Sequence, residues 1–229
     1  MTNEIQGATK RSIQLSAQPD SYPLGGMIPI HVRYQNRSQT TISFREPQKT
    51  WSVQMAVGRP NAAPVEVAFG RIGGGTKGGV TRWTVERAET ITLGPGATYE
   101  FDYDAGQRWP DQFAPGFHVL QIKDMSDDSE TVLSNQVDIR VVYDQSTFPA
   151  LLALASADKA TLDVRAFAAK WIAALFPDFH LSPAPDPAHA AAEKEQFAKA
   201  RAWWSAHGNE PGVGRQISRL NSDAASVPR

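Results

Sequence analysis

The chain has 229 residues, of which 41% are hydrophobic and 21% charged, a composition typical of a folded globular protein rather than a disordered one. Its 23 basic and 24 acidic residues leave a formal net charge of -1, so no general positive field attracts nucleic acid or an anionic membrane surface. The sequence contains no cysteine, which excludes disulfide bonds, thiolate metal sites and a cysteine nucleophile.

The first twenty residues contain no apolar run that resembles the core of a signal peptide. No segment approaches the ~20 consecutive apolar residues that a membrane-spanning helix needs. We therefore expect a cytoplasmic protein that has neither a membrane nor a nucleic acid as partner.

Residues 12–143 are predicted to form β-strands, because their apolar residues recur mostly with a period of two between intervals rich in Gly, Pro, Asn, Asp and Ser. The predicted strands are residues 12–17, 27–35, 40–45, 51–57, 65–72, 83–93, 98–104, 116–123 and 131–143. The turns at Leu93-Gly94-Pro95-Gly96 and Asn36-Arg37-Ser38 are short, which implies that neighbouring strands are antiparallel.

Within these strands, three apolar sets alternate most clearly with polar residues. They are Ile28, Ile30, Val32 and Tyr34, then Trp51, Val53, Met55 and Val57, and finally Val137, Ile139 and Val141. Successive side chains of a strand point to opposite faces, so each set is predicted to face a core and its polar neighbours to face water. Sheets with one buried and one solvated face are typical of an antiparallel β-sandwich.

After Asp144 the period becomes helical. Val164, Phe167, Ala168, Trp171 and Leu175 form one apolar stripe, which ends at Pro177. A second stripe in residues 188–207 consists of Phe197, Ala200, Trp203 and Trp204, with Gly208 as the expected C-cap. The segment beyond Gly208 is polar and rich in Gly and Ser, so we predict a flexible or irregular tail. The predicted organisation is a β-sandwich at 1–146, a helical hairpin at 147–208 and the tail at 209–229.

Three stretches resemble a known pattern: YPLGGMIPIHVRYQNRSQTTISF at 22–44, LGPGATYEFDYD at 93–104, and FAPGFHVLQI with SNQVDIRVV within 113–142. Together they resemble bacterial immunoglobulin-like domains of the intracellular proteinase inhibitor type. The resemblance covers about 120 residues and implies a mainly β fold, an immunoglobulin-like antiparallel β-sandwich with a C-terminal α-helical hairpin. The inhibitory role is an analogy from the fold. The segment DVRAFAAKWIAALFPD also resembles one unit of a HEAT-type helical repeat.

Two groups of acidic residues are candidates for metal binding or acid-base chemistry. Glu100, Asp102 and Asp104 alternate with aromatic residues and so share one face of a strand. The favoured interpretation is the solvated side of a strand whose aromatic side is buried. Asp124, Asp127, Asp128 and Glu130 crowd a hairpin, but without the ligand spacing of an EF-hand, which favours a solvated acidic turn over a calcium loop.

The glycine-rich stretch at 70–79 suggests a phosphate-binding loop, but Thr76 precedes Lys77 and a strand follows, whereas a Walker loop has the reverse order and a following helix. A flexible hairpin loop is the favoured interpretation. The five histidines are scattered and show no zinc-binding spacing, and no nucleophile-elbow motif is present. We therefore predict no cofactor, no metal and no catalytic residue.

The sequence is best explained by a non-catalytic module that binds another protein by steric occlusion, as an inhibitor or immunity-type partner does. Uneven loops at 70–79 and 105–115 are the expected contact surface. Adjacent Trp203 and Trp204 lie about 100° apart on a helix, so one of them is a candidate interface anchor, although packing of both within the helical hairpin is the simpler interpretation. The predicted partner-binding residues are Arg71, Lys77, Trp109, Phe113 and Trp203.

Two other functions stay open at this point. One is a structural or accessory domain of a bacterial secretion or surface assembly, in which the helical tail docks onto a larger body. The other is a hydrolase with a triad assembled from distant residues, which a sequence does not reveal. The sequence predicts no oligomeric state.

Overall fold

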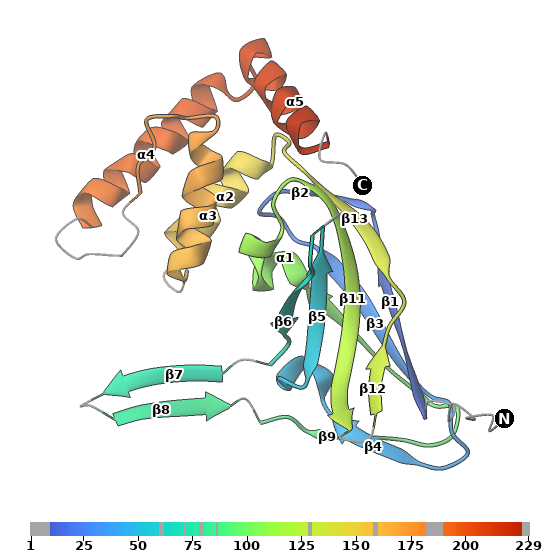
Figure 1. Cartoon of the computed structure of the whole chain (residues 1–229). Coiled ribbons are helices and arrows are strands. Elements are labelled where there is room, and N and C mark those ends of the chain that lie inside the picture. Colours follow the sequence, from blue (N-terminus) through green and yellow to red (C-terminus); the bar gives the residue numbers. More distant parts are fainter. Residues whose placement is uncertain are drawn as a thin grey trace.

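The computed structural model describes residues 10–59, 62–70, 72–77, 80–85, 87–127, 130–157, 160–181 and 190–225. For 72–77 and 80–85 the description covers the backbone pairing. Strands occupy the part of this chain before residue 143, and helices dominate the part after it (Figure 1).

The strands are β1 (Arg11–Ala17), β2 (Ser21–Pro23), β3 (Pro29–Asn36), β4 (Ile42–Arg45), β5 (Val53–Gly58), β6 (Val65–Ala68), β7 (Ile72–Lys77), β8 (Val80–Val85), β9 (Thr90–Leu93), β10 (Thr98–Asp104), β11 (Gly116–Asp127), β12 (Glu130–Leu133) and β13 (Val137–Val142). The helices are α1 (Ala105–Arg108), α2 (Thr147–Ser156), α3 (Leu162–Ala173), α4 (Ala190–His207) and α5 (Pro211–Ala225), with short 3₁₀ turns at Pro47–Lys49 and Pro110–Gln112.

Two sheets form the body of the strand-rich part. A three-stranded sheet has the order β1-β3-β10, and a larger sheet has the order β2-β13-β11-β5-β6, with β12 also paired to β11. The pairings within both sheets are antiparallel except that of β2 with β13, which is parallel. Strands β4 and β9 form a separate antiparallel pair at the end of the body remote from the helices (Figure 1).

The two sheets enclose a core made by the alternating residues that the sequence indicates. On β3, Ile30, Val32 and Tyr34 are at most 1% exposed, and on β5 Val53 and Met55 are fully buried. The ring of Tyr34 stacks on Phe44 and Phe101 at centroid distances of 5.2 and 6.3 Å, which joins strands far apart in the sequence. The core therefore depends on period-two patterning on both sheets.

The helical part packs onto one end of this body and continues its core. Phe148 and Leu151 of α2 are fully buried, and the side chain of Leu151 fills the space beside Gly25, where an added Cβ would lie 2.9 Å from Leu151 Cδ2. Gly25 has a φ of +73°, a conformation that glycine adopts without strain. The buried apolar residues of strands and helices form one continuous cluster.

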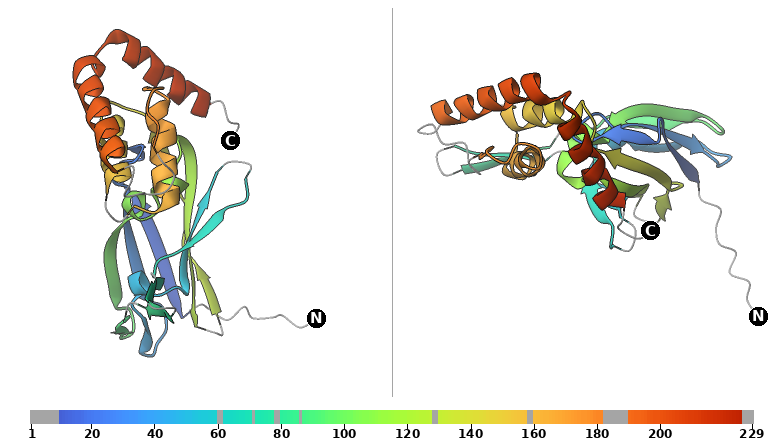
Figure 2. Two further views of the ribbon diagram at one scale, coloured as in Figure 1. Left: turned by 90° about the vertical axis from the view of Figure 1, so that its left-hand side faces the viewer. Right: turned by 90° about the horizontal axis from the view of Figure 1, so that it is seen from above.

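Helix α5 is fixed to the end of β13 by one side chain. The Asn221 side chain accepts a hydrogen bond from Tyr143 N at 2.7 Å and donates one to Tyr143 O at 2.8 Å. The Gln216 amide also donates to Ala174 O at 2.6 Å, at the end of α3. Figure 2 shows α4 beside α2, and α5 running from the end of α4 toward the strands, where it contacts β11.

The predicted antiparallel sheets are confirmed, but helices take a larger share of the chain than predicted, because α2 and α5 join the two expected helices. The prediction of an irregular tail at 209–229 is wrong for Pro211–Ala225, which is helix α5. Its apolar residues Val213, Ile217 and Leu220 recur at helical spacing and pack on the core, which offsets the cost of the two glycines inside the helix.

Candidate functional site

The glycine-rich stretch was predicted to be a flexible hairpin loop, and Ile72–Lys77 is strand β7 of a hairpin, paired with Val80–Val85 from Ile72↔Val85 to Lys77↔Val80. The two strands form a sheet of their own, and in Figure 1 this hairpin projects from the body. Predicted contact residue Lys77 ends β7. Arg71 lies outside the described residues. Their roles as contact residues stay predictions.

The second predicted contact loop, residues 105–115, is folded against the end of the sandwich as α1 and the 3₁₀ turn Pro110–Gln112. Phe113 is 1% exposed and packs edge-on against His118 at 5.6 Å, so the prediction that it is a surface anchor is wrong. Trp109 is partly buried, with its ring 5.5 Å from Phe69 and 5.4 Å from Tyr103. The sequence did not predict the burial of Trp109, because Phe69, which covers it, is distant in the sequence.

Trp203 lies among aromatic side chains of three helical segments. Its ring is stacked on Phe176 at 5.3 Å and lies 5.6 Å from Phe148 and 5.7 Å from His207. Trp204 contacts the same Phe148 and stacks on it at 4.7 Å with an interplanar angle of 8°. Both tryptophans therefore pack within the helical part, as the simpler interpretation of the sequence predicts, but neither is completely buried.

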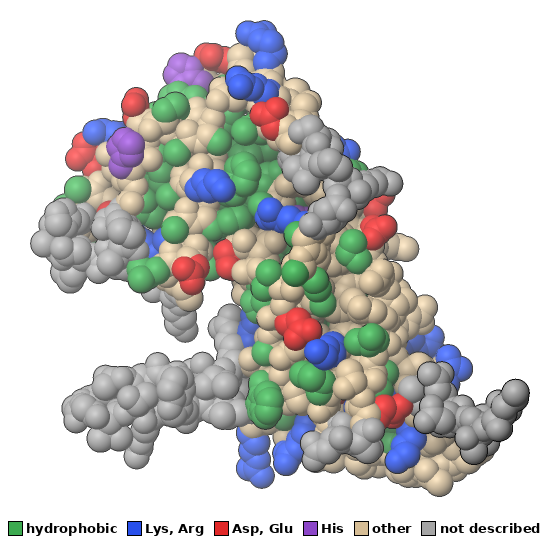
Figure 3. Space-filling view, in the orientation of Figure 1, with side chains coloured by type: hydrophobic (Ala, Val, Ile, Leu, Met, Phe, Trp, Pro, Cys, Tyr) green, Lys and Arg blue, Asp and Glu red, His purple; other side chains and the backbone are tan. Residues whose placement is uncertain are grey.

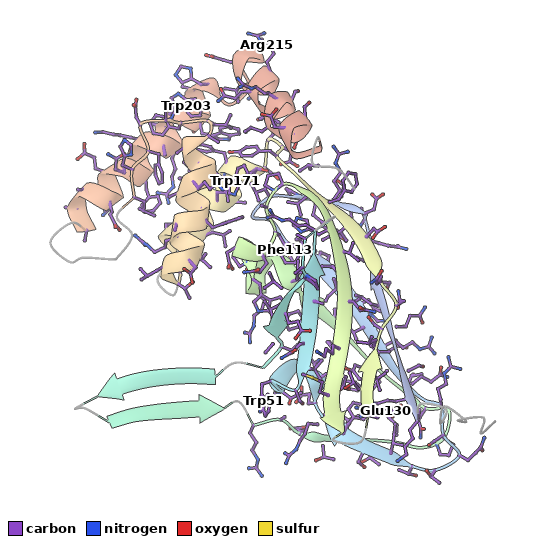
Figure 4. All side chains as sticks on the ribbon, in the orientation of Figure 1. Trp51, Phe113, Glu130, Trp171, Trp203 and Arg215 are labelled. Atoms are coloured by element: carbon purple, nitrogen blue, oxygen red, sulfur yellow. The ribbon has the colours of Figure 1, made fainter. Side chains whose placement is uncertain are left out.

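Five large apolar side chains of the helical part stay partly exposed, and we refer to them together as the aromatic face: Phe167, Trp171, Phe176, Trp203 and Leu220. Figure 3 shows hydrophobic side chains gathered over the helices on this side of the molecule, and Figure 4 shows Trp171 of α3 and Trp203 of α4 between neighbouring helices. The Lys170 ammonium lies 5.2 Å from the centroid of the Trp171 ring. Sequence reasoning missed Phe176 and Leu220, because Phe176 follows α3 and Leu220 belongs to the unexpected helix α5.

A buried ion pair sets the position of α4, and with it that of Trp203. Arg165 of α3 donates to Glu193 of α4 at 2.8 Å and to Ala155 O of α2 at 3.1 Å. Their side chains are only 7% and 15% exposed. Because a buried charge is costly without its partner, this pair fixes α4 relative to α2 and α3.

The acidic residues of β10 form a cross-strand charge ladder. His31 lies opposite Asp102, with Nδ1 2.9 Å from a carboxylate oxygen, and Arg33 lies opposite Glu100 at 3.1 Å. Asp104 instead accepts hydrogen bonds from the backbone of Ile28 and Gln107 and caps α1. These contacts agree with the favoured interpretation, the solvated side of a strand whose aromatic residues are buried.

Asp124 of the acidic hairpin is fully buried and does not face solvent. Arg11 Nη2 lies 3.3 Å from Asp124 Oδ1, and Ser126 N donates to the same oxygen at 2.8 Å. Burial, with the nearby Asp124 carboxylate, raises the pKa of the Tyr34 hydroxyl well above its usual value. Asp128 lies outside the described residues. Within the described part of the chain, no three His, Asp or Glu side chains gather in a way that suits a metal ion.

A cavity of about 590 Å³ lies beside β2, β13 and β11. Its lining residues are Asp20, Ser21, Phe117, His118, Val119, Asp138, Ile139 and Arg140. The His118 ring is buried and is held by a hydrogen bond between Nε2 and Ala114 O at 2.6 Å. Burial lowers the pKa of this histidine. The Arg140 guanidinium lies over the Phe117 ring at 5.4 Å.

No protein-family model matches the sequence, and no curated protein is similar to it. Several solved structures show a distant likeness. A β-glucosidase from Listeria innocua is 13% identical over 57% of this chain and 16% of that chain, with a TM-score of 0.33. The chain thus spans about a sixth of that enzyme.

In two further solved structures, the similarity covers a larger share of the matched chain. The CARDB domain of a Pyrococcus furiosus protein, in complex with di-metal ions, is 11% identical over 58% of this chain and 87% of that chain, with a TM-score of 0.32. The sporulation control protein Spo0M from Bacillus subtilis is 8% identical over 65% of this chain and 55% of that chain, with a TM-score of 0.35.

None of the helices in the described ranges combines the length and the apolar character needed to span a bilayer.

Proposed function

We propose that the chain is a non-catalytic protein-binding module, in which an immunoglobulin-like sandwich carries a helical part that presents the aromatic face to another protein. The observation that carries this proposal is the partial exposure of Phe167, Trp171, Phe176, Trp203 and Leu220 in the helical part.

Aromatic side chains in this setting are typical of an interface. Large contiguous apolar surface on a soluble domain marks interaction sites, since water contact with it is unfavourable. Tryptophan and phenylalanine contribute large contact areas at low entropic cost, and tryptophan is enriched among the residues that dominate binding energy. Phe167 contacts Trp171 edge to face and Phe176 stacks on Trp203, so each ring of these two pairs is held by its neighbour before a partner binds.

The mode of action that we propose is steric occlusion, as in an inhibitor or immunity-type partner. A rigid body with a fixed apolar face blocks whatever surface it covers, and no reacting group is required. The resemblance of 22–44, 93–104 and 113–142 to immunoglobulin-like domains of the intracellular proteinase inhibitor type supports this mode by analogy of fold.

The same face also favours a second candidate, an accessory domain that docks onto a larger assembly. In that case the partner is a structural component and the aromatic face is covered permanently. The two functions differ in their effect on the partner, because occlusion abolishes the partner's own activity whereas docking preserves it.

Affinity capture with surface variants tests the proposal. The full chain, Phe167→Glu and the matched control Leu162→Glu are immobilised and exposed to lysate of the source organism, and retained proteins are quantified by mass spectrometry. Leu162 is 53% exposed on the same helix but about 140° from Phe167, so it carries the same change of charge on another side of α3.

We expect one protein to be retained in stoichiometric amount by the full chain and by Leu162→Glu, and at least about ten-fold less by Phe167→Glu, since burying a carboxylate at an apolar contact is costly. Circular dichroism confirms that both variants are folded. Equal retention by the two variants, or no stoichiometric protein at all, overturns the proposal.

A further inference from the structure

A second surface of the helical part has the character of a small-molecule site. Between α2 and α4 lies a groove of about 480 Å³, lined by Pro149, Leu152, Ala153, Ser156, Arg201, Trp204 and Ser205. Its volume lies within the range of about 300–1,000 Å³ that is usual for ligand pockets.

The groove follows from the spacing of residues on its two helices. The α2 residues 149, 152, 153 and 156 are separated by three, four and seven positions, and so are 201, 204 and 205 of α4 by three and four, which places each set on one side of its helix. Stacking of Trp204 on Phe148, which is itself fully buried, fixes the indole at the side of the groove. The apolar walls are therefore preformed.

The groove contains a single charged residue, Arg201, among its lining. Arg201 is exposed, and no carboxylate of a described residue lies within ion-pair distance of it. By contrast, the neighbouring Lys199 is paired with Glu195 at 2.7 Å. The other side chains of the lining that carry a polar group are Ser156 and Ser205, with a hydroxyl each, and Trp204, with its indole N–H.

We propose that this groove binds an aliphatic monocarboxylate, with its hydrocarbon chain against Leu152, Pro149 and Trp204 and its carboxylate on Arg201. An exposed guanidinium can donate two parallel N–H···O bonds to one carboxylate. An alcohol or an amine has no pair of oxygens to accept them. Helix α2 has 10 residues and so is about 15 Å long, which suits a chain of moderate length. This site is separate from the aromatic face and its occupancy does not depend on the proposed protein binding.

Isothermal titration calorimetry of the full chain with octanoate, octanol and octylamine tests the proposal, each below the concentration at which it aggregates. We expect saturable binding of octanoate with one site per chain, and at least about ten-fold weaker binding of octanol and octylamine. Arg201→Gln is expected to weaken octanoate binding about ten-fold, while Lys199→Gln, the matched loss of a nearby exposed cation, changes the affinity by less than about two-fold.

A second variant tests the apolar part of the site. Ala153 is exposed at the groove, so Ala153→Phe fills the groove without entering the core and is expected to abolish octanoate binding while the thermal midpoint is preserved. The proposal is overturned by the absence of saturable octanoate binding, by octanol binding as tightly as octanoate, or by unchanged affinity in both Arg201→Gln and Ala153→Phe.

Discussion

Single residues at buried positions determine how this protein responds to pH. The His118 ring is buried, its Nε2 binds Ala114 O, and no described residue offers a hydrogen bond to its Nδ1. The neutral ring is therefore favoured in the folded state, and the pKa is lowered by desolvation.

The direction of the pH effect follows from linkage. In the unfolded chain the histidine takes up a proton near pH 6.5, whereas the folded chain resists protonation until a lower pH. The contribution of His118 to stability is therefore complete above about pH 6.5 and is lost as the pH falls toward the folded-state pKa. Chemical denaturation between about pH 7 and about pH 5 is expected to show a steeper loss of stability for the wild type than for His118→Gln. Equal slopes for the wild type and His118→Gln contradict this account.

The Arg165–Glu193 pair is the second test at this scale. Arg165→Met leaves the Glu193 carboxylate without its partner in a nearly buried position, so we expect a loss of about 3 kcal/mol in the free energy of unfolding. The double variant Arg165→Met/Glu193→Leu removes both charges and is expected to recover most of this loss. Urea denaturation of the wild type, the two single variants and the double variant gives the coupling free energy between Arg165 and Glu193. Additive effects of the two single changes contradict the expected coupling.

The sequence predicted the burial of side chains in alternating strands but not their long-range partners. Val53, Met55 and Val57 face the core as the pattern indicates, yet Trp51, in the same alternating set, is 61% exposed because the strand begins only at Val53. Phe113 belongs to no periodic pattern, so its burial against the nearby His118 was not predicted. Buried ion pairs such as Arg11 with Asp124 join residues more than a hundred positions apart and have no local signal.

At the scale of the elements, α5 shows how packing against the rest of the protein stabilises a helix with weak intrinsic helix propensity. Its glycines and serines favour an irregular structure, but Pro211 is acceptable at the first position of a helix, and Val213, Ile217 and Leu220 form an apolar stripe. Its attachment to β13 through the Asn221 side chain then decides where α5 lies.

Removal of that side chain is expected to release α5. Asn221→Ala loses two neutral hydrogen bonds and leaves two backbone groups of Tyr143 unpaired, for which we expect about 2 kcal/mol of local destabilisation. Hydrogen exchange measured by mass spectrometry is expected to become faster in residues 211–225. Ser222→Ala serves as the control, because Ser222 bonds only to Ser218 O within the helix. If exchange in α5 is unchanged in Asn221→Ala, its attachment lies elsewhere.

The elements that the sequence did not predict have identifiable causes. Helix α2 has an almost continuous apolar sequence, which gives no amphipathic period, although only the side with Phe148, Leu151, Leu152 and Ala155 is buried. Strand β7 contains three consecutive glycines, which lower strand propensity, and its pairing with β8 is what defines it. Two members of the aromatic face, Phe176 and Leu220, lie after α3 and on α5. The apolar periodicity of the sequence therefore indicated only its members on α3 and α4.

On the scale of the whole molecule, strands and helices are expected to unfold together. The buried cluster is continuous across residue 146, Tyr143 OH donates to Trp171 O, and Leu151 packs beside Gly25. We therefore expect one thermal transition in scanning calorimetry, with equal calorimetric and van't Hoff enthalpies. Two separate transitions, one for the sandwich and one for the helices, contradict a shared core.

The central claim is that another protein covers the aromatic face. Hydroxyl-radical footprinting with mass spectrometry tests this claim directly, because it measures the oxidation of individual tryptophan rings. If the claim holds, these rings are less exposed to solvent in the captured complex than in the free chain. Oxidation of Trp171 and Trp203 is expected to fall in the complex, while Trp51, which is 61% exposed and remote from the helices in Figure 4, stays as reactive as before. Undiminished oxidation of Trp171 and Trp203 in the complex contradicts the claim.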